Sequence, residues 1–374
     1  MTSIMNLRKI VWGGCLMLVL TAGWQEANAY SYHIKKSTGT KIVWASPQIS
    51  FHAGNKSFAS GSPFRDALVL ANFKWNQTPS RFTFGSPIWG DTSIKRGNGQ
   101  NEIWFSNDQD ALKGAPAICY TWWYSSSGRL WYEEADIVFD AGRAWSPHYR
   151  PYQHLTPYGG ANRPFTTTAI HEMGHALGLG HENRWKNVMG QDTTHVLTHQ
   201  DFALGYAGAD ATQGAVFLYG AHSYPWEDLA VTHWKYGGAS GEYSVHTPTV
   251  IYNPSMTVVF WDTLNGMRRY HVKRGNTYRP EFTFENNGRS TQSNVKFGLY
   301  ISTNTYITTG DQLIGEGWFG MGPGGVWTTP ITITIPTNLT VGMTYYLGVI
   351  VDHKNNISEF HEMNATFLQI RIVP

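Results

Sequence analysis

The segment 166–189 reads TTTAIHEMGHALGLGHENRWKNVM and holds the residues best suited to chemistry. It contains the pattern HExxHxxGxxH, in which His171 and His175 are four residues apart. Residues with this spacing lie on one face of a helix, so both imidazoles can bind one zinc ion at about 2.0–2.1 Å. Glu172 then lies beside the metal. Its carboxylate can accept a proton from water and return it to a leaving amine, which is general acid–base catalysis of peptide hydrolysis.

His181 completes the pattern only if the helix ends before it. It lies six residues after His175, and a continuing helix would turn it away from the metal. Gly178 can adopt the left-handed backbone angles of a helix end and turn the chain back. Three imidazoles leave one coordination position open, which is typical of a catalytic rather than a structural zinc site. An accidental match to all five specified residues is roughly a one-in-ten-thousand event at this composition.

The residues around this segment alternate between strand and helix patterns from 41 to 220. Ser62 followed by Pro63 is a helix start signal. The residues that then recur at the spacing of one buried helical face are Phe64, Ala67, Leu68, Ala71 and Trp75. Short runs rich in Ile, Val, Phe and Trp predict strands within 41–52, 81–84, 102–105 and 135–139. Residues 141–164, with several Pro and Gly and no periodicity, predict a long surface loop.

After Gly220 the pattern is that of strands alone. The runs 257–262 and 267–272 flank Asn265 and Gly266, a dipeptide typical of a tight hairpin turn. Further strands are expected at 281–285, 295–302, 329–335, 345–351 and 367–373. Regular short strands of this kind predict an all-β sandwich.

The first 29 residues have the pattern of an export signal. A short basic stretch precedes the apolar run 10–20, and Ala-Asn-Ala at 27–29 is a small-x-small cleavage site, so we expect cleavage before Tyr30. A lipid anchor on Cys15 is the alternative. No later run reaches the roughly 18 apolar residues of a membrane helix, so we expect a secreted protein without a transmembrane segment, in the extracellular space, periplasm or cell surface.

Composition excludes several classes of protein. The chain has 374 residues, enough for two domains, and its 14% of charged residues against 14% aromatics excludes a mainly disordered chain. A net charge of +2, with no Lys/Arg run, argues against a nucleic-acid partner. Removal of the signal would leave Cys119 alone, so no intrachain disulfide can form. We expect Cys119 to be a buried apolar residue rather than a reactive thiol or a thiolate that blocks the zinc.

The N-terminal part resembles the metzincin clan of zinc endopeptidases, and within it the matrixins. Besides the zinc signature, residues 187–190 look like the clan's Met-turn, and Met189 falls eight residues after His181, the matrixin spacing. The resemblance extends to 71–84, 134–140 and 214–220. It implies a mixed twisted sheet with three main helices and a Met189 thioether beneath the metal. It also implies one catalytic zinc bound by three histidines, with Glu172 as general base.

Two features depart from the matrixin pattern. Glu182 follows the third histidine, where matrixins typically have Ser; a Glu at this position is more like astacins. Gly190 and Gln191, however, offer no Tyr at the place that astacins use for an extra zinc ligand. The inhibitory pro-segment of the family has no obvious counterpart, because only about eleven residues separate Tyr30 from the first expected strand. The clan is therefore better defined by the sequence than the subfamily.

The C-terminal part, 267–374, resembles CARDB, a bacterial sandwich domain related to cell adhesion. The stretches that carry the likeness are 282–290, 299–304 and 345–366. Such a module implies attachment to a surface, a partner or a substrate, or simple stabilisation of the first domain.

Further metal ions are left open. His148 and His154 could bind a second, structural zinc, although solvated loop residues are the simpler interpretation. Asn107, Asp108 and Asp110 could bind a structural calcium ion or serve as turn residues.

The sequence thus predicts an α+β metzincin-type domain followed by an immunoglobulin-like sandwich. The expected ranges are a signal peptide at 1–29, a matrixin-like domain at 30–220, a connector at 221–266 and a CARDB-like domain at 267–374. The expected function is a secreted zinc endopeptidase acting on proteins or peptides. The alternatives are an adhesin with a vestigial protease domain and a zinc hydrolase of cell-wall peptides.

Overall fold

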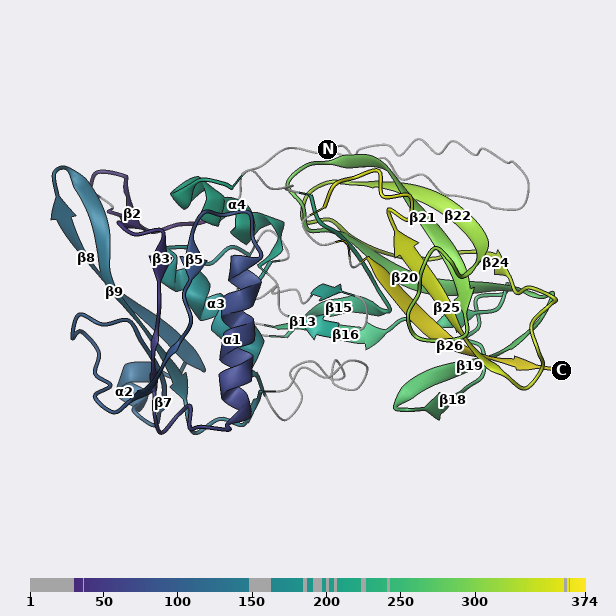
Figure 1. The fold of residues 1–374 in the computed structure, drawn as a ribbon, viewed down its shortest axis with the longest axis horizontal. Helices are drawn as coiled ribbons and strands as arrows, with labels where there is room; N and C mark the ends of the chain where they lie inside the picture. Colours follow the sequence, from purple (N-terminus) through teal and green to yellow (C-terminus); the bar gives the residue numbers. More distant parts are fainter. Residues whose placement is uncertain are drawn as a thin grey trace, which may run out of the picture.

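The computed structural model forms two units at opposite ends of the molecule (Figure 1). The N-terminal unit, within 30–222, contains helices and a mixed sheet, and the C-terminal unit, within 227–374, contains two packed sheets. The structure describes residues 30–35, 37–147, 163–183, 187–190, 197–199, 202–204, 207–222, 227–240, 243–359, 362 and 364–374. The expected signal peptide lies outside these residues. Within them, no helix has the length and apolar character needed to cross a membrane.

The described helices all belong to the N-terminal unit. They are α1 (Pro63–Asn76), α2 (Gln109–Leu112), α3 (Phe165–Ala176) and α4 (Gly208–Tyr219). The structure confirms the helix expected after Ser62, whose hydroxyl oxygen accepts a hydrogen bond from the Phe64 backbone N–H at 3.3 Å. Its predicted apolar face is buried at Ala67, Leu68, Ala71 and Trp75.

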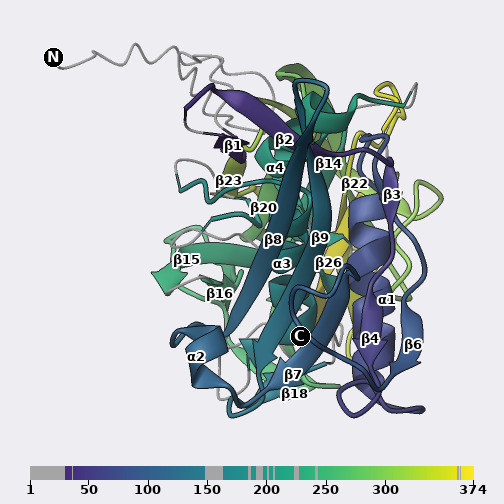
Figure 2. The same cartoon turned by 90° about the vertical axis from the view of Figure 1, so that its left-hand side faces the viewer.

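The N-terminal sheet is mostly parallel. Its strands are β1 (Ile34–Lys35), β2 (Thr40–Trp44), β9 (Arg129–Asp140), β7 (Glu102–Ser106), β4 (His52–Gly54) and β6 (Ile88–Asp91) in spatial order, with β8 (Ala117–Ser126) also paired to β9. Only the β1–β2 and β8–β9 pairs are antiparallel. The short two-stranded pairs are β3 (Gln48–Ile49) with β5 (Thr83–Phe84), β10 (Trp145–Ser146) with β11 (Arg163–Pro164), and β12 (Leu197–His199) with β13 (Phe202–Leu204). Figure 2 shows β8 and β9 as long neighbouring strands on the side facing away from the C-terminal unit.

Several strand predictions needed correction. The run 41–52 is not one strand: a bend at 45–47 that includes Pro47 separates β2 from β3, and residues 50–51 separate β3 from β4. The ten-residue β8 was not predicted, because its last four residues are exposed and its aromatic and serine residues do not alternate clearly between buried and exposed positions. The expected loop 141–164 carries β10 and β11 at its ends, and its interior lies outside the described residues.

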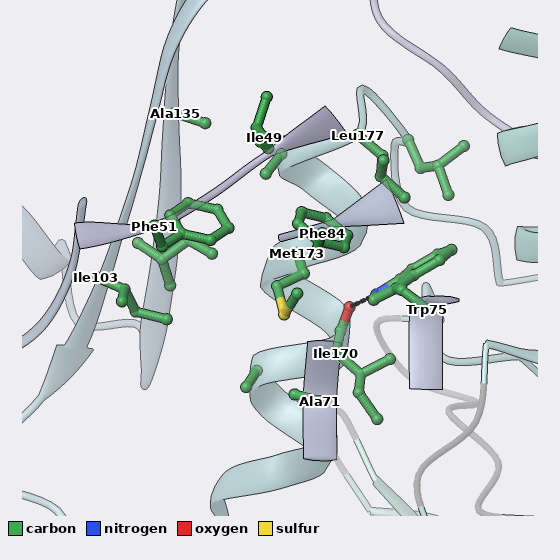
Figure 3. Packing of buried hydrophobic residues seen from close by; sticks show 14 of the residues in the cluster. Ile49, Phe51, Ala71, Trp75, Phe84, Ile103, Ala135, Ile170, Met173 and Leu177 are labelled. Carbon is green, nitrogen blue, oxygen red and sulfur yellow. Dashed lines mark hydrogen bonds between the residues drawn. The ribbon is translucent and has the colours of Figure 1, made fainter. Parts of the chain in front are cut away.

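The core of the N-terminal unit lies between the sheet, α1 and α3 (Figure 3). Trp75 of α1 reaches α3, where its indole N–H donates to the Ile170 carbonyl oxygen at 2.8 Å. Phe165, at the start of α3, is fully buried among aromatic rings that include Phe105 and Phe139. Cys119 is a free cysteine, so packing rather than a disulfide stabilises this unit.

Two facing sheets form the C-terminal unit. One contains β14 (Leu229–Thr232), β20 (Thr277–Asn286), β17 (Ile251–Tyr252), β23 (Val326–Pro330) and β24 (Ile333–Thr334). The other contains β18 (Trp261–Leu264), β19 (Met267–Lys273), β26 (Ala365–Val373), β25 (Thr344–Val351), β21 (Gln292–Ser302) and β22 (Gln312–Met321). A separate hairpin consists of β15 (Trp234–Ser240) and β16 (Tyr243–Pro248). Phe282, Phe284, Phe297, Leu347 and Ile370 are buried between the sheets.

The hairpin expected around Asn265 and Gly266 is present. Both residues have positive φ, at 53° and 79°, and they join the antiparallel pair β18–β19. The expected connector 221–266 needs correction, because its strands β14 and β17 pair with β20 and so belong to the sandwich. The expected strand 329–335 is split between β23 and β24 after Pro330, and β22 was missed.

Three carboxylates from β7 and β9 are buried in the N-terminal unit. Glu102, Glu134 and Asp136 are at most 3% exposed. Backbone N–H groups satisfy them: Gly97 donates to Glu134 at 2.8 Å and to Asp136 at 3.2 Å. Burial, together with the neighbouring Glu134, raises the pKa of Asp136 to about 8.

This raised pKa predicts that stability falls as pH rises. Between the ordinary pKa of an aspartate, about 3.9, and the folded value, about 8, the folded state holds a proton at Asp136 that the unfolded state has released. The melting temperature should therefore fall from pH 5 to pH 9, and fall less in Asp136→Asn, whose amide needs no added proton. Thermal unfolding followed by circular dichroism measures both slopes. Asp110→Asn, which alters an exposed carboxylate, is the control, and equal slopes in the wild type and Asp136→Asn would refute this explanation.

Candidate metal centre

Three imidazoles converge at the end of α3. The Nε2 atoms of His171 and His175 are 3.1 Å apart, those of His175 and His181 are 3.1 Å apart, and those of His171 and His181 are 3.2 Å apart. The nearly equilateral triangle is built from two residues one helical turn apart and a third from the chain that follows the helix. His171 is buried, His175 is partly buried and His181 is exposed, so the group opens to solvent on the side of His181.

Backbone carbonyls fix the orientation of two of these rings. His171 Nδ1 lies 2.6 Å from the Val188 carbonyl oxygen, and His175 Nδ1 lies 2.8 Å from the Leu179 carbonyl oxygen. A carbonyl oxygen can only accept, so each Nδ1 carries the proton and each Nε2 presents a lone pair. Burial lowers the pKa of His171 to about 4 and that of His175 well below its ordinary value, so both rings are neutral at neutral pH.

The triangle fits a tetrahedral metal ion with nitrogen ligands. Bonds of about 2.0–2.1 Å at tetrahedral angles place ligand nitrogens about 3.3–3.4 Å apart, close to the separations here. Lone pairs directed at one another across such distances repel unless a cation lies between them. The donor set has no thiolate and leaves room for a further ligand, and both features suit a catalytic zinc. Among the described residues, His171, His175 and His181 are the group whose ligand atoms converge in this way.

Gly178 provides the turn that brings His181 to the other two. Its φ is +97°, in the left-handed region, directly after the helix end. A Cβ there would also lie 2.9 Å from the Tyr132 hydroxyl oxygen, so both the backbone angle and the packing require glycine.

Met189 packs against the turn of α3 that carries His171 and His175. A Cβ on Gly174, between the two helix histidines, would lie 2.2 Å from the Met189 sulfur. Asn187 holds this turn: its side-chain oxygen accepts from the Met189 N–H at 2.7 Å, and its amide donates to the Glu182 carbonyl oxygen at 3.2 Å. The Glu182 N–H donates to the Met189 carbonyl oxygen at 3.1 Å, which ties the Met-turn to the segment that carries His181.

Aromatic side chains satisfy carbonyl groups that the end of α3 leaves without helical partners. The Trp44 indole N–H donates to the Ala176 carbonyl oxygen at 2.7 Å, and the Tyr219 hydroxyl donates to the Leu177 carbonyl oxygen at 2.7 Å. These bonds attach the helix end to β2 and α4.

Glu172 is buried next to His171, with 6% of its surface exposed. Cys119 of β8 lies close enough for the Glu172 charge to add to the effect of burial, which raises the pKa of the thiol well above its usual value. Cys119 is therefore a neutral thiol and is not part of the histidine group.

Of the residues considered for further metals, the structure describes Asn107, Asp108 and Asp110. Asp108 caps α2, since its carboxylate accepts from the Ala111 N–H at 3.1 Å, while Asn107 and Asp110 are exposed. His148 and His154 lie outside the described residues.

Sequence reasoning missed the residues that support the site. They are His33, Trp44, Tyr132 and Tyr219, which come from distant parts of the chain and carry no local pattern. Gly174 did offer a signal, because a glycine inside a helix is unfavourable unless close packing requires it.

Family models match a segment in each of the two units. A family model described as Matrixin matches residues 100–220, which include the three histidines and Met189. A second model, CARDB, matches residues 254–369, a start earlier than the expected 267. A search of curated proteins found no match.

Solved structures resemble parts of the chain at low identity. The crystal structure of a CARDB domain from Pyrococcus furiosus, in complex with di-metal ions, is 16% identical, with a TM-score of 0.25, and the match covers 41% of this chain and 93% of that one. A solution structure of a CARDB domain from the same organism is 17% identical, with a TM-score of 0.25, and covers 40% and 97%. A family 123 glycoside hydrolase from Clostridium perfringens is 13% identical, with a TM-score of 0.17, and covers 27% and 21%. The family matches show that the chain joins a matrixin metallopeptidase-like segment to a CARDB domain, in that order along the sequence.

Proposed function

We propose that this protein is a secreted zinc endopeptidase that hydrolyses peptide bonds in proteins. The observation that carries the proposal is the triangle of Nε2 atoms 3.1–3.2 Å apart, with the Nδ1 atoms of His171 and His175 held by backbone carbonyls. This arrangement suits one metal ion with an open coordination position. The matrixin match supports the reaction class.

Glu172 is the residue proposed to move the proton. A zinc ion at the three histidines would supply Lewis acidity, polarising a substrate carbonyl and acidifying water. Glu172 follows His171 directly in α3, and its buried side chain lies next to the histidine group. It would accept the proton of the attacking water and return it to the leaving amine nitrogen.

The free edge of β8 is the proposed binding place for the substrate backbone. Among the described strands β8 pairs with β9 alone, and it packs beside α3. An extended peptide could therefore add to this edge by main-chain hydrogen bonds and pass close to the histidines. Residues 191–200, which follow the Met189 turn, are proposed to shape the specificity pocket; the structure describes only 197–199 of this range.

The CARDB domain would hold the enzyme at a surface, a protein partner or its substrate. It supplies no residue to the histidine group. Its proposed role is therefore location, and hydrolysis is assigned to the N-terminal unit.

Replacement of Glu172 by Gln should abolish proteolysis without removing zinc. The amide keeps the shape of the side chain but cannot accept a proton, and general acid–base catalysis contributes about 10²–10⁴-fold in rate. Clearing of casein or gelatin in a zymogram measures activity, and elemental analysis measures bound zinc.

Glu133→Gln is the matched control, because Glu133 lies on β9 with its side chain exposed. It should retain full activity. Cleavage by Glu172→Gln at the wild-type rate would remove Glu172 from the mechanism.

Removal of the metal should abolish activity reversibly. The purified chain should contain about one zinc ion, lose casein cleavage in a strong chelator and regain it on addition of zinc. His175→Ala should bind zinc far more weakly and recover nothing. A chain that binds zinc but shows no chelator-sensitive clearing would favour the adhesin with a vestigial protease domain.

For an active enzyme, mass spectrometry of a digested peptide library would give the cleavage specificity. Cleavage confined to cell-wall peptides would favour a zinc hydrolase of cell-wall peptides.

A further inference from the structure

The first described residues of the chain lie directly on the loop that follows α3. Residues 30–33, here called the strap, form an antiparallel bridge with this loop between Tyr32 and Leu179. The His33 N–H donates to the Gly178 carbonyl oxygen at 2.8 Å, and the Gly180 N–H donates to the Ser31 carbonyl oxygen at 2.8 Å. The strap therefore pairs with all three loop residues, Gly178, Leu179 and Gly180.

These three loop residues set the positions of two metal ligands. Leu179 supplies the carbonyl that accepts from His175 Nδ1, and Gly180 directly precedes His181. A shift of the loop would change the orientation of one imidazole and the position of another. The strap thus acts on the ligands through the backbone it pairs with.

His33 adds a side-chain contact to the same place. Its Nδ1 shares a hydrogen bond of 2.7 Å with the hydroxyl of Tyr132, which is itself packed against Gly178. The His33 and His175 rings are almost parallel, with 6° between their planes and 6.5 Å between their centroids. His33 therefore lies beside the site without being one of the three converging ligands.

The packing around the strap is close enough to require glycine in its neighbours. A Cβ on Gly180 would lie 2.6 Å from the Ser31 hydroxyl oxygen, and one on Gly214 of α4 would lie 3.0 Å from the Tyr30 Cβ. Tyr30 and Tyr32 each pack on Phe217 of α4, with ring centroids 5.2 Å apart. The strap is thus fixed to α4 at one end and to the ligand loop at the other.

We propose that the strap, with His33 as a positioning residue, holds the loop of His181 in its metal-binding geometry and so slows the loss of zinc. This inference rests on the proposed function for the identity of the metal. Neither His33 nor Tyr132 needs to touch substrate, so the effect should be on metal retention first and on catalysis only through it.

The test compares variants by the rate at which zinc passes to an excess of a chromogenic chelator. His33→Pro removes both the ring and the N–H donated to Gly178, and outer partners of metal ligands are typically worth about 10–100-fold in metal affinity. We expect zinc release from His33→Pro to be faster by a factor in that range, with a smaller increase for His33→Ala, which keeps the N–H. His33→Gln, whose amide can still hydrogen-bond with Tyr132, should recover part of the difference between His33→Ala and the wild type.

Ile34→Ala is the control, because it changes the next residue of the segment, whose side chain is 42% exposed. It should release zinc at the wild-type rate. A second measurement, hydrogen exchange of the Gly180 amide in metal-free protein, should show faster exchange in His33→Pro than in Ile34→Ala. This readout needs neither zinc nor activity, and thermal unfolding shows whether each variant is folded.

Equal zinc-release rates in the folded His33 variants and the wild type, or equal Gly180 exchange, would overturn the proposal. Such a result in a chain that cleaves casein would leave the proposed function intact. Conversely, a wild-type chain that binds zinc, follows the expected order of variants and cleaves nothing would support the strap and contradict the endopeptidase function.

Discussion

The site depends on the hydrogen bonds from the Nδ1 atoms of His171 and His175 to backbone carbonyl oxygens of Val188 and Leu179. Each bond fixes the tautomer of a ring, and therefore which nitrogen presents its lone pair. The two carbonyls lie outside α3, one in the Met-turn and one after the helix end. Two loops thus orient the histidines on one face of a single helix, and a movement of either loop would change the candidate metal centre.

Much of the N-terminal unit can be understood as support for those loops. Asn187 links the Met-turn to the segment after the helix, Met189 packs on Gly174, and Trp44 and Tyr219 bind carbonyls at the end of α3. A helix end buried without such donors would leave polar groups unsatisfied at considerable cost. The same bonds that satisfy the helix end also fix where the chain leaves it.

The two units are joined by contacts as well as by the chain. β14, the first strand of the sandwich sheet, lies close to β12, which follows the Met-turn. Lys74 of α1 and Asp228, just before β14, are 4% and 2% exposed. Burial lowers the pKa of Lys74 to about 8, and the charge of Asp228 opposes that change. The sandwich therefore packs against the N-terminal unit through β14, which lies within the range 221–266 that the sequence analysis expected to be a connector.

The sequence determined the parts of this protein that depend on neighbours along the chain. The spacing of His171, His175 and His181 places three candidate metal ligands on one helix and one turn, with Glu172 next to His171. The cap at Ser62 set the start of α1, and the Asn265–Gly266 turn set a hairpin, because each is a local conformational preference. The residues that support the end of α3 and the loop after it depend on the tertiary structure, because His33, Trp44, Tyr132 and Tyr219 come from parts of the chain far away in sequence. The edge position of β8 among the described strands and the place of β14 in the sandwich also depend on the tertiary structure, because strand pairing depends on packing across the sheet rather than on the strand's own residues.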